Sequence, residues 1–423
     1  MNPRELLLGS FQAALAAADP LHIVPSHLPN PPAGRTLVVG AGKAAASMAT
    51  AVEAHWPPGA PLEGVVITRY GHGMPTSRIR VVEAGHPVPD EAGESAAREI
   101  LAGARGLMPD DLLLALVSGG GSSLLSLPVP GISMADLKAV TRELLRCGAP
   151  IQDMNTVRKH LSAIQGGRLA AACRAQVLAL VISDVTGDDP THIGSGPCTP
   201  DPTTYADAIE ILERFGVTPP ASIAAHLAHG ASGAIAETPK PGDQAFTRVE
   251  NRVIATAHRS LAAGAAYVQA RGVSPMVLGD SVTGESSEVA KVYAALARQI
   301  RAHSHPMKPP VALISGGETT VTVRGNGRGG RCTEFLLSLA IELEGMERVH
   351  ALACDTDGID GSEDNAGAML MPDALARAAA QGIVAKKLLA VNDGYGFFSA
   401  LGDLVVTGPT RTNVNDYRII IVQ

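Results

Sequence analysis

The sequence predicts an α/β protein built from two α/β domains with mostly parallel sheets. Strand-like and helix-like segments alternate along most of its 423 residues, as they do in βα repeats. Several strand-like segments are apolar throughout, which suits strands that are buried on both faces of a parallel sheet. Five of them end abruptly in a cluster of small and polar residues. Because ligands bind beyond the carboxyl ends of strands in such sheets, we expect these clusters to hold the functional groups.

The amino-terminal half of the chain is expected to form helices that alternate with strands. The helices are expected over residues 3–18, 43–54, 91–104 and 134–147, and the strands over 36–39, 64–68, 79–83, 112–117 and 177–182. Ser133, with Asp136 three residues later, forms a start for the last helix that resembles a capping box, and Gly148 is a suitable stop.

The carboxyl-terminal half resumes the alternation after a change of character at residues 227–243. This stretch holds small residues, two prolines and little periodicity, so we place a domain boundary there. The expected domains are residues 1–240 and 241–423, since one core rarely supports so long a chain. The expected strands cover 253–256, 276–278, 311–314, 351–354, 404–407 and 418–422, and the expected helices cover 260–271, 287–303 and 333–343.

Composition narrows the class of protein. The net charge of −7 and the aromatic content of 3% argue against general binding of nucleic acid or of anionic membranes. No apolar run is long enough to span a bilayer, and the amino terminus has no compelling signal-peptide pattern. The five cysteines form no C-x-x-C pair, which fits a reducing compartment. We therefore expect a cytoplasmic protein that binds small molecules, and we leave its oligomeric state open between monomer and homodimer.

The first cluster follows the first strand and contains Gly40, Gly42 and Lys43. Glycines let the backbone approach a phosphate at the amino terminus of the next helix, and Lys43 suits a phosphoryl group. Together with Ala45, the two glycines also match the loose G-x-G-x-x-G/A dinucleotide fingerprint. Arg69 stands near the position where that fingerprint expects an acid, which an NADP site could use. A tight turn without a ligand is the simpler alternative.

The second cluster follows the strand over 112–117 and is rich in glycine. Its candidate binding residues are Ser118, Gly119, Gly120, Gly121 and Ser122. Three consecutive glycines carry a cost in conformational entropy, which a row of N–H groups wrapped around a phosphate would offset. A flexible hinge is the alternative, and the G-x-x-x-x-G-K-[ST] pattern of a Walker loop does not occur in the sequence.

Asn155 and Arg158 belong to a polar stretch that precedes a further pair of glycines. Arg158, with Lys159 beside it, could clamp a carboxylate or a phosphate, and an arginine can do so bidentately. A solvated helix face explains the same residues without any ligand, so both interpretations stay open.

Two acidic clusters suit a divalent cation. They contain Asp184, Asp188 and Asp189 after the strand over 177–182, and Asp355, Asp357 and Asp360 after the strand over 351–354. Mg²⁺ is usually held by one or two carboxylates together with substrate phosphates, and a carboxylate can also accept a hydroxyl proton. The candidate metal ligands are Asp189, Asp355 and Asp357, and Asp189 is also a candidate catalytic residue. Asx turns and helix caps are the alternative.

Two more segments add glycine, acid and arginine. Gly316, Gly317 and Glu318 follow the strand over 311–314, and a glycine-rich basic loop over 325–331 ends in Arg331. Such a loop suits closure on phosphates, with arginine neutralising charge in the transition state, although a plain surface loop explains it equally simply. The sequence contains no histidine pair that indicates zinc and no G-x-S-x-G elbow of a hydrolase.

Nine stretches, spread in order over nearly the whole chain, match a known family. They are Val39–Ala45, Gly85–Asp90, Ser118–Ser123, Asn155–Ser162, Ser183–Asp189, Ser195–Pro197, Ser315–Thr320, Asp355–Gly361 and Thr407–Asp416. On these residues the chain resembles the class II glycerate 2-kinases, whose carboxyl-terminal part is the MOFRL domain.

The resemblance implies ATP-dependent phosphorylation of D-glycerate on its 2-hydroxyl, giving 2-phosphoglycerate and ADP, with Mg²⁺ as the expected metal. It also implies that the amino-terminal domain is Rossmann-like and that the active site lies in the cleft between the two domains. The key lysine and arginine of the family fall on Lys43 and Arg331. After that arginine the family has Asn-Gln, whereas Cys332 and Thr333 stand here, which bears on substrate or nucleotide specificity.

Members of the family also carry the name hydroxypyruvate reductase, so an NAD(P)H-dependent reductase is the alternative enzyme. A reductase needs a dinucleotide site, for which the loose fingerprint at Gly40 is the single candidate. A kinase needs phosphate-binding loops, cations and carboxylates, which several clusters supply. We therefore expect phosphoryl transfer in which Lys43 and Arg331 neutralise the transferring group. A non-catalytic sugar-acid binding protein is the second alternative.

Overall fold

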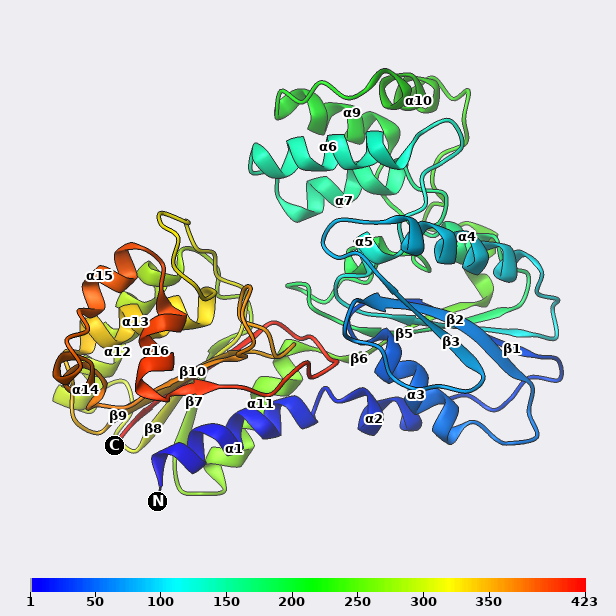
Figure 1. Ribbon diagram of the computed structural model, residues 1–423. Helices are drawn as coiled ribbons and strands as arrows, with labels where there is room; N and C mark the ends of the chain where they lie inside the picture. Colours follow the sequence, from blue (N-terminus) through cyan, green and yellow to red (C-terminus); the bar gives the residue numbers. More distant parts are fainter. Residues whose placement is uncertain (1) are drawn as a thin grey trace. The chain divides into compact units, whose positions relative to one another are not determined.

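The computed structural model describes residues 2–423, which fold into two compact units (Figure 1). The middle unit comprises Pro20–Ile254, and the terminal unit combines the chain before Pro20 with Ala255–Gln423. These bounds differ from the expected domains at both ends of the middle unit.

Packing explains both differences. Helix α1 (Pro3–Ala16) buries Leu6, Leu7 and Phe11 in the core of the terminal unit, so the chain's first helix belongs with its last strands. Strand β6 (Val249–Ala255) still belongs to the sheet of the middle unit. The stretch expected to be a linker contains the end of helix α10 (Ala221–Ala231), which packs within the middle unit.

The middle unit is built on a sheet with the strand order β3-β2-β1-β4-β5-β6. Its other strands are β1 (Thr36–Ala41), β2 (Leu62–Arg69), β3 (Ile79–Ala84), β4 (Leu112–Val117) and β5 (Gln176–Ile182). All pairings among β1–β5 are parallel. The same strand order occurs in doubly wound dinucleotide-binding sheets. Strand β4 is buried at every position, which is why its sequence is apolar without interruption.

The middle unit contains two groups of helices, one beside the sheet and one with an apolar cluster of its own. The helices near the sheet are α2 (Pro20–Ile23), α3 (Ala45–His55), α4 (Glu91–Arg105), α5 (Gly121–Leu124) and α8 (Arg168–Ala171). A separate group contains α6 (Met134–Arg146), α7 (Ile151–His160), α9 (Tyr205–Arg214) and α10. This group encloses its own apolar cluster around Leu137, Val157 and Tyr205 and lies together in Figure 1. Short 3₁₀ turns cover Val24–His27, Ile193–Ser195 and Gln244–Arg248.

The terminal unit is built on a mixed sheet with the strand order β11-β10-β9-β12-β8-β7. The strands are β7 (Ser274–Gly279), β8 (Val311–Ser315), β9 (Val349–Asp355), β10 (Gly367–Leu370), β11 (Leu404–Val405) and β12 (Asp416–Val422). Strand β12 is antiparallel to both β8 and β9, and β10 is antiparallel to both β9 and β11. Since β7 is parallel to β8, most strands share one direction, as expected, while β10 and β12 oppose them.

Helices cover both faces of this sheet. Alternate residues of β8 and β12 enter two different cores, because successive side chains of a strand point to opposite faces. One core contains α1 and α11 (Ala257–Gln269). The other contains α12 (Ser286–His303), α13 (Arg331–Leu343), α14 (Ala374–Ala380), α15 (Ala385–Ala390) and α16 (Gly394–Leu401).

All five clusters follow strands, as the sequence predicts. Because β1, β4 and β5 are adjacent and parallel, their three clusters share one edge of the middle sheet. Strands β8 and β9 also share a direction, so the clusters after them lie at one edge of the terminal sheet. Between them β12 begins, and its first residue, Asp416, pairs with Asp355 in the strand register. Because β12 runs antiparallel to β8 and β9, its first residue, Asp416, lies beside the clusters that follow those two strands.

Over residues 2–423, no single helix is long and apolar enough to cross a membrane. The bent pair Pro3–Ala16 and Pro20–His27 meets the requirement of length and composition when the two are taken together.

Candidate functional site

The first two clusters of the middle unit are joined by backbone hydrogen bonds. Lys43 N donates to Gly119 O at 2.8 Å, and Ser118 N donates to Ala41 O at 3.2 Å. The Ser118 side chain adds a third link, since its Oγ accepts from Ala44 N at 3.1 Å. Lys43 and the glycine loop over 118–123 are therefore parts of one rigid assembly at the edge of the sheet.

Contacts inside the protein account for the glycines of the first cluster. A Cβ on Gly40 would lie 2.2 Å from Leu116 O, and one on Gly42 would lie 2.1 Å from Ser118 Oγ. Gly42 also has a φ of +140°, which side chains disfavour. Both glycines are thus required by neighbouring strands and loops. The G-x-G pattern needs no dinucleotide to explain it, which weakens the basis for a reductase.

Gly120 lies between Lys43 and His86, a histidine that was not among the candidate residues. Its φ is +80°, and a Cβ there would lie 2.9 Å from His86 Nε2 and 3.5 Å from Lys43 Cγ. His86 comes from the loop after β3, within one of the stretches that carry the family resemblance. The glycine loop is therefore flanked by a lysine and by an imidazole.

The second cluster also meets the polar stretch of α7. Arg158 Nη1 donates to Asn155 Oδ1 at 2.8 Å. Ser195 Oγ lies 3.1 Å from that same Asn155 Oδ1 and 2.8 Å from Ser122 Oγ. Ser195 was not among the candidate residues, because nothing in its local sequence shows that the chain folds back to this place. Ser122, Asn155 and Arg158 are thus brought together as expected candidates, with Ser195 between them.

Arg158 is a desolvated cation without an acidic partner. Its side chain is half-buried, and it forms no ion pair with any residue in the described range 2–423. Burial lowers the pKa of its guanidinium to about 10. Because a desolvated guanidinium is stabilised by carboxylate or phosphate, this position suits an anionic ligand.

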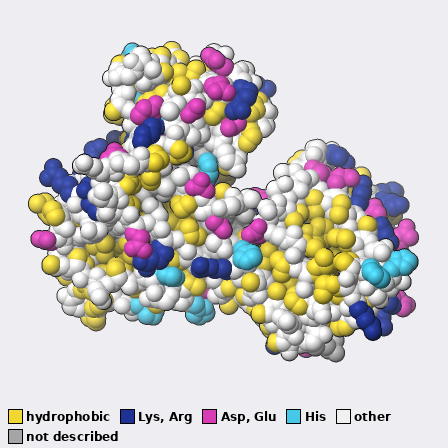
Figure 2. Space-filling view, turned by 180° about the vertical axis from the view of Figure 1, so that it is seen from behind, with side chains coloured by type: hydrophobic (Ala, Val, Ile, Leu, Met, Phe, Trp, Pro, Cys, Tyr) yellow, Lys and Arg dark blue, Asp and Glu magenta, His cyan; other side chains and the backbone are white. Residues whose placement is uncertain are grey.

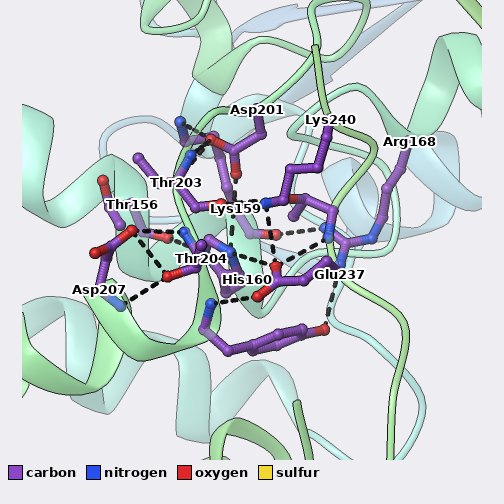
Figure 3. Close-up of polar contacts among 12 residues, drawn as sticks. Thr156, Lys159, His160, Arg168, Asp201, Thr203, Thr204, Asp207, Glu237 and Lys240 are labelled. Atoms are coloured by element: carbon purple, nitrogen blue, oxygen red, sulfur yellow. Dashed lines mark hydrogen bonds and ion pairs between the residues drawn. The ribbon is translucent and has the colours of Figure 1, made fainter. Parts of the chain in front are cut away.

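Lys159 does not share this role, which corrects the expectation that it clamps a ligand beside Arg158. Its Nζ lies 2.7 Å from Asp201 Oδ1, and both side chains are buried. Successive residues of a helix point in directions about 100° apart, so Lys159 faces the protein interior. Figure 3 shows it within a network that includes His160, Thr203 and Lys240. Burial raises the pKa of Asp201 and Lys159 lowers it, with a net shift downward.

Asp189 lies on the same edge of the sheet, in the loop after β5. Its side chain is exposed, and its Oδ1 accepts from Thr191 N at 2.9 Å. One carboxylate oxygen therefore stabilises a turn, as the simpler interpretation of this loop requires. Within the described chain, no hydrogen bond joins Asp189 to Lys43 or Arg158.

In the terminal unit, Arg331 is held by three carboxylates. It lies 2.8 Å from Glu318, 2.7 Å from Asp355 and 2.8 Å from Asp416. Burial acts to lower the pKa of Arg331, but the three carboxylates raise it above its usual range. Asp416 was not among the candidate residues, because the direction of β12 cannot be read from its sequence.

A second arginine extends this cluster inward. Arg418 is fully buried, pairs with Asp416, and donates to Gly316 O and Thr319 Oγ1, each at 3.1 Å. The cluster therefore holds three carboxylates and two guanidinium groups, so that negative charge is in excess. Gly317 serves close packing here, since its φ is +97° and a Cβ would lie 2.4 Å from Val282 N.

Both candidate metal ligands of this unit accept hydrogen bonds from the protein. Asp355 Oδ1 accepts from Asp357 N at 3.0 Å, and Asp357 Oδ1 accepts from Ile359 N at 2.9 Å. Across residues 2–423, no group of three or more His, Cys, Asp or Glu side chains is arranged to hold a metal ion. The described residues of this loop therefore do not form a coordination shell by themselves.

Asp360, Cys332 and Thr333 have structural tasks. The Asp360 carboxylate accepts from Cys332 N and Thr333 N at 2.9 Å each, and from Thr333 Oγ1 at 2.8 Å. It therefore caps the start of α13, as the cap interpretation of the acidic loop foresees. Both residues that depart from the family pattern are buried, so the structure gives them no direct access to a ligand.

Glu334, which was also not among the candidate residues, has a raised pKa. It is buried at the start of α13, where burial raises its pKa to about 7. Asn392 Nδ2 donates to Glu334 Oε1 at 3.2 Å, and Asn392 Oδ1 accepts from Arg324 N at 2.6 Å. Asn392 thereby ties the glycine-rich basic loop to the helix that carries Arg331.

The strand order is that of doubly wound α/β sheets, and the cationic side chains of Lys43 and Arg158 beside the glycine loop suit an anionic ligand. Residues 6–228 match the family described as "Domain of unknown function (DUF4147)", and residues 311–416 match the "MOFRL family". The chain belongs to the family that joins these two domains.

Named relatives fall into two groups. The chain is 38% identical to the glycerate 2-kinase of Pyrococcus horikoshii, covering 92% of this chain and 88% of that protein. It is 50% identical to an Agrobacterium vitis protein named "Putative hydroxypyruvate reductase", covering 100% of this chain and 95% of the relative. The crystal structure of the Thermotoga maritima glycerate kinase superimposes with a TM-score of 0.88 at 36% identity, over 99% of both chains.

Proposed function

We propose that the protein is a glycerate 2-kinase, which transfers the terminal phosphoryl group of ATP to the 2-hydroxyl of D-glycerate. The observation that carries this proposal is the pair Lys43 and Arg158. Both are cationic side chains beside the glycine loop of a doubly wound sheet, and Arg158 has no acidic partner in the described chain. Relatives named glycerate 2-kinase, at 37% and 38% identity over most of the chain, support the same activity.

The middle unit supplies the groups that bind and orient. Phosphoryl transfer depends mainly on positioning and on stabilising charge, so cations beside the phosphates are the central requirement. Lys43 neutralises the transferring group, and Arg158, oriented by Asn155, holds a carboxylate or phosphate bidentately. Asp189 keeps one carboxylate oxygen outside its turn hydrogen bond, and this oxygen accepts the hydroxyl proton or binds the metal.

The terminal unit supplies excess negative charge, which favours a divalent cation. Mg²⁺ requires only one or two protein carboxylates when phosphates complete its shell, so Asp355 and Asp357 are the proposed ligands of a metal that arrives with the nucleotide. When bound, Mg²⁺ neutralises charge on the phosphates. Arg331 can neutralise an anion that replaces Glu318, the exposed member of its three carboxylates.

The reductase remains the second candidate because of the Agrobacterium vitis relative at 50% identity. The deciding experiment incubates the pure protein with ATP, Mg²⁺ and D-glycerate, and separately with NADPH and hydroxypyruvate. We expect ADP and 2-phosphoglycerate, identified by phosphorus NMR, and no oxidation of NADPH. NADPH oxidation without ADP would replace the kinase by the reductase. Ligand binding without turnover in either mixture would favour a sugar-acid binding protein.

A further inference from the structure

A cavity of about 140 Å³ in the middle unit opens beside the glycine loop. Its walls come from the loop after β3 and from α5, α6 and α7, and they include the exposed apolar side chains of Val88 and Leu145. Ligand pockets usually have volumes of roughly 300 to 1,000 Å³, so this cavity suits one ring system better than a whole cofactor.

The charged residues that line this cavity are all basic. They are Lys138 and Arg142 of α6 and Arg158 of α7. None of the three forms an ion pair with a residue in the range 2–423. Asp90, on which the charge of Lys138 acts, already accepts hydrogen bonds from Gly93 N and from Tyr70 Oη.

This lining is unusual for the molecule. The chain has a net charge of −7, and Figure 2 shows basic and acidic side chains interspersed over the visible face. Three cations around one space repel each other unless an anion compensates them. The cavity therefore calls for a ligand that combines an apolar part with negative charge.

The cavity continues into the phosphate-binding region. Ser123, the last residue of the glycine loop, lines it. Arg158 both lines it and orients toward Asn155, which Ser195 links to Ser122. A ligand whose ring occupies the cavity can therefore place its charged part on the glycine loop.

We propose that this cavity binds the purine ring of the nucleoside triphosphate, with the phosphates directed toward Gly120 and Lys43. The inference rests on the proposed kinase function. Aliphatic side chains such as Val88 and Leu145 pack against the flat faces of the ring, and the three cations attract the phosphates. This assigns the nucleotide, rather than the sugar acid, to the side of the glycine loop that faces α6.

The test replaces the apolar wall and measures nucleotide affinity. In the double variant Val88→Gln and Leu145→Gln, we expect the KM for ATP to rise roughly tenfold, from the loss of apolar contact at two side chains. The kcat at saturating ATP and the KM for glycerate stay unchanged. Val292→Gln in α12 is the matched control, because Val292 and Val88 are both 60% exposed and Val292 lies outside the cavity.

Calorimetric titration with adenosine and with tripolyphosphate separates the two parts of the ligand. We expect the double variant to lose adenosine binding and to retain tripolyphosphate binding. An unchanged KM for ATP in an active double variant would overturn the inference and leave the kinase function standing. A rise in the KM for glycerate alone would also overturn it, by assigning the cavity to the acceptor. If the wild type shows no kinase turnover, the proposed function fails, and the adenosine titration still decides the cavity.

Discussion

Arg158 and Lys159 are adjacent in sequence and equally basic, yet the fold gives them opposite tasks. Arg158 lines the cavity beside the glycine loop and has no acidic partner in the described chain, whereas Lys159 is buried against Asp201 at 2.7 Å. The difference follows from the helix, which turns consecutive side chains to different faces. A motif that matches a family can therefore combine a candidate binding residue with a structural one.

The different surroundings of Arg158 and Lys159 predict that the same substitution affects ligand binding at one position and stability at the other. Arg158→Met is expected to raise the KM for ATP or glycerate at least about tenfold and to leave stability unchanged, because it removes a charge-assisted contact with the ligand. Lys159→Met is expected to cost about 3–5 kcal/mol of stability, since it leaves the Asp201 carboxylate buried without its partner. Steady-state kinetics and urea denaturation of both variants measure these effects. The opposite assignment of the two effects would contradict the interpretation.

Lys43 is expected to be essential for transfer and dispensable for folding. The loop that carries it is held by backbone hydrogen bonds and by Ser118 Oγ, none of which needs the lysine side chain. In Lys43→Ala we expect kcat to fall at least about 100-fold, because a charge that stabilises the transition state is lost. Lys291→Ala, which removes an exposed lysine of α12, is the control. Retained turnover in Lys43→Ala, with an unchanged circular dichroism spectrum, would remove Lys43 from the mechanism.

At the scale of elements, most of the fold is predictable because it depends on local signals. Alternating apolar strands and helices, together with the cap at Ser133, predict elements that the structure confirms within a few residues, such as α6 and β4. The candidate residues at the ends of β1, β4, β8 and β9 are also local to those strands. Their shared edges then follow from the strand order and directions.

Two residues that were not among the candidates, Asp416 and Asn392, reach the site only through tertiary pairing. Asp416 joins the Arg331 cluster only because β12 enters antiparallel between β8 and β9. Asn392 reaches Glu334 from 58 residues away in the sequence. No local pattern reveals strand direction or such a distant contact, so this part of the site could not be predicted from the sequence.

The start of α13 is expected to respond to pH through Glu334. Its pKa is raised from 4.5 to about 7, because burial disfavours the carboxylate and the charges of Glu285 and Asp360 add to this effect. The native state thus holds a proton that the unfolded chain releases. The resulting stabilisation is complete below about pH 4.5 and is lost as the pH rises through 7, a change of about 3 kcal/mol.

Glu334→Gln should abolish this pH dependence. Urea unfolding at pH 5 and at pH 8 is expected to show a smaller loss of stability in the variant than in the wild type. Glu288→Gln, at an exposed position of the neighbouring helix α12, should behave like the wild type. An equal pH dependence in wild type and Glu334→Gln would show that other groups control it.

At the scale of the whole molecule, the terminal unit is discontinuous in sequence. Leu6, Leu7 and Phe11 of α1 are at most 1% exposed within its core. Burying three such side chains contributes roughly 5–9 kcal/mol. A typical domain has a total stability of about 5–15 kcal/mol, so the unit depends on its first helix.

This dependence predicts that residues 255–423 do not fold stably by themselves. Joining residues 2–19 to this fragment through a flexible linker is expected to restore a cooperative unfolding transition, because it returns α1 to its place. The same linked protein carrying Phe11→Asp should fail to recover it. Calorimetry of the three proteins tests the prediction, and a cooperative transition in the fragment without α1 would contradict it.

The discontinuity also has a consequence for synthesis on the ribosome. Ser10 of α1 and its hydrogen-bond partner Tyr417 lie 407 residues apart in the chain. At translation rates of about 5–20 residues per second, α1 emerges roughly 20 to 80 seconds before the strand that it must cover. The middle unit can be completed during that interval, while the apolar side of α1 waits. During synthesis α1 therefore lacks the strands that bury it in the folded protein, whereas a chain that refolds from denaturant has α1 and β12 present together from the start.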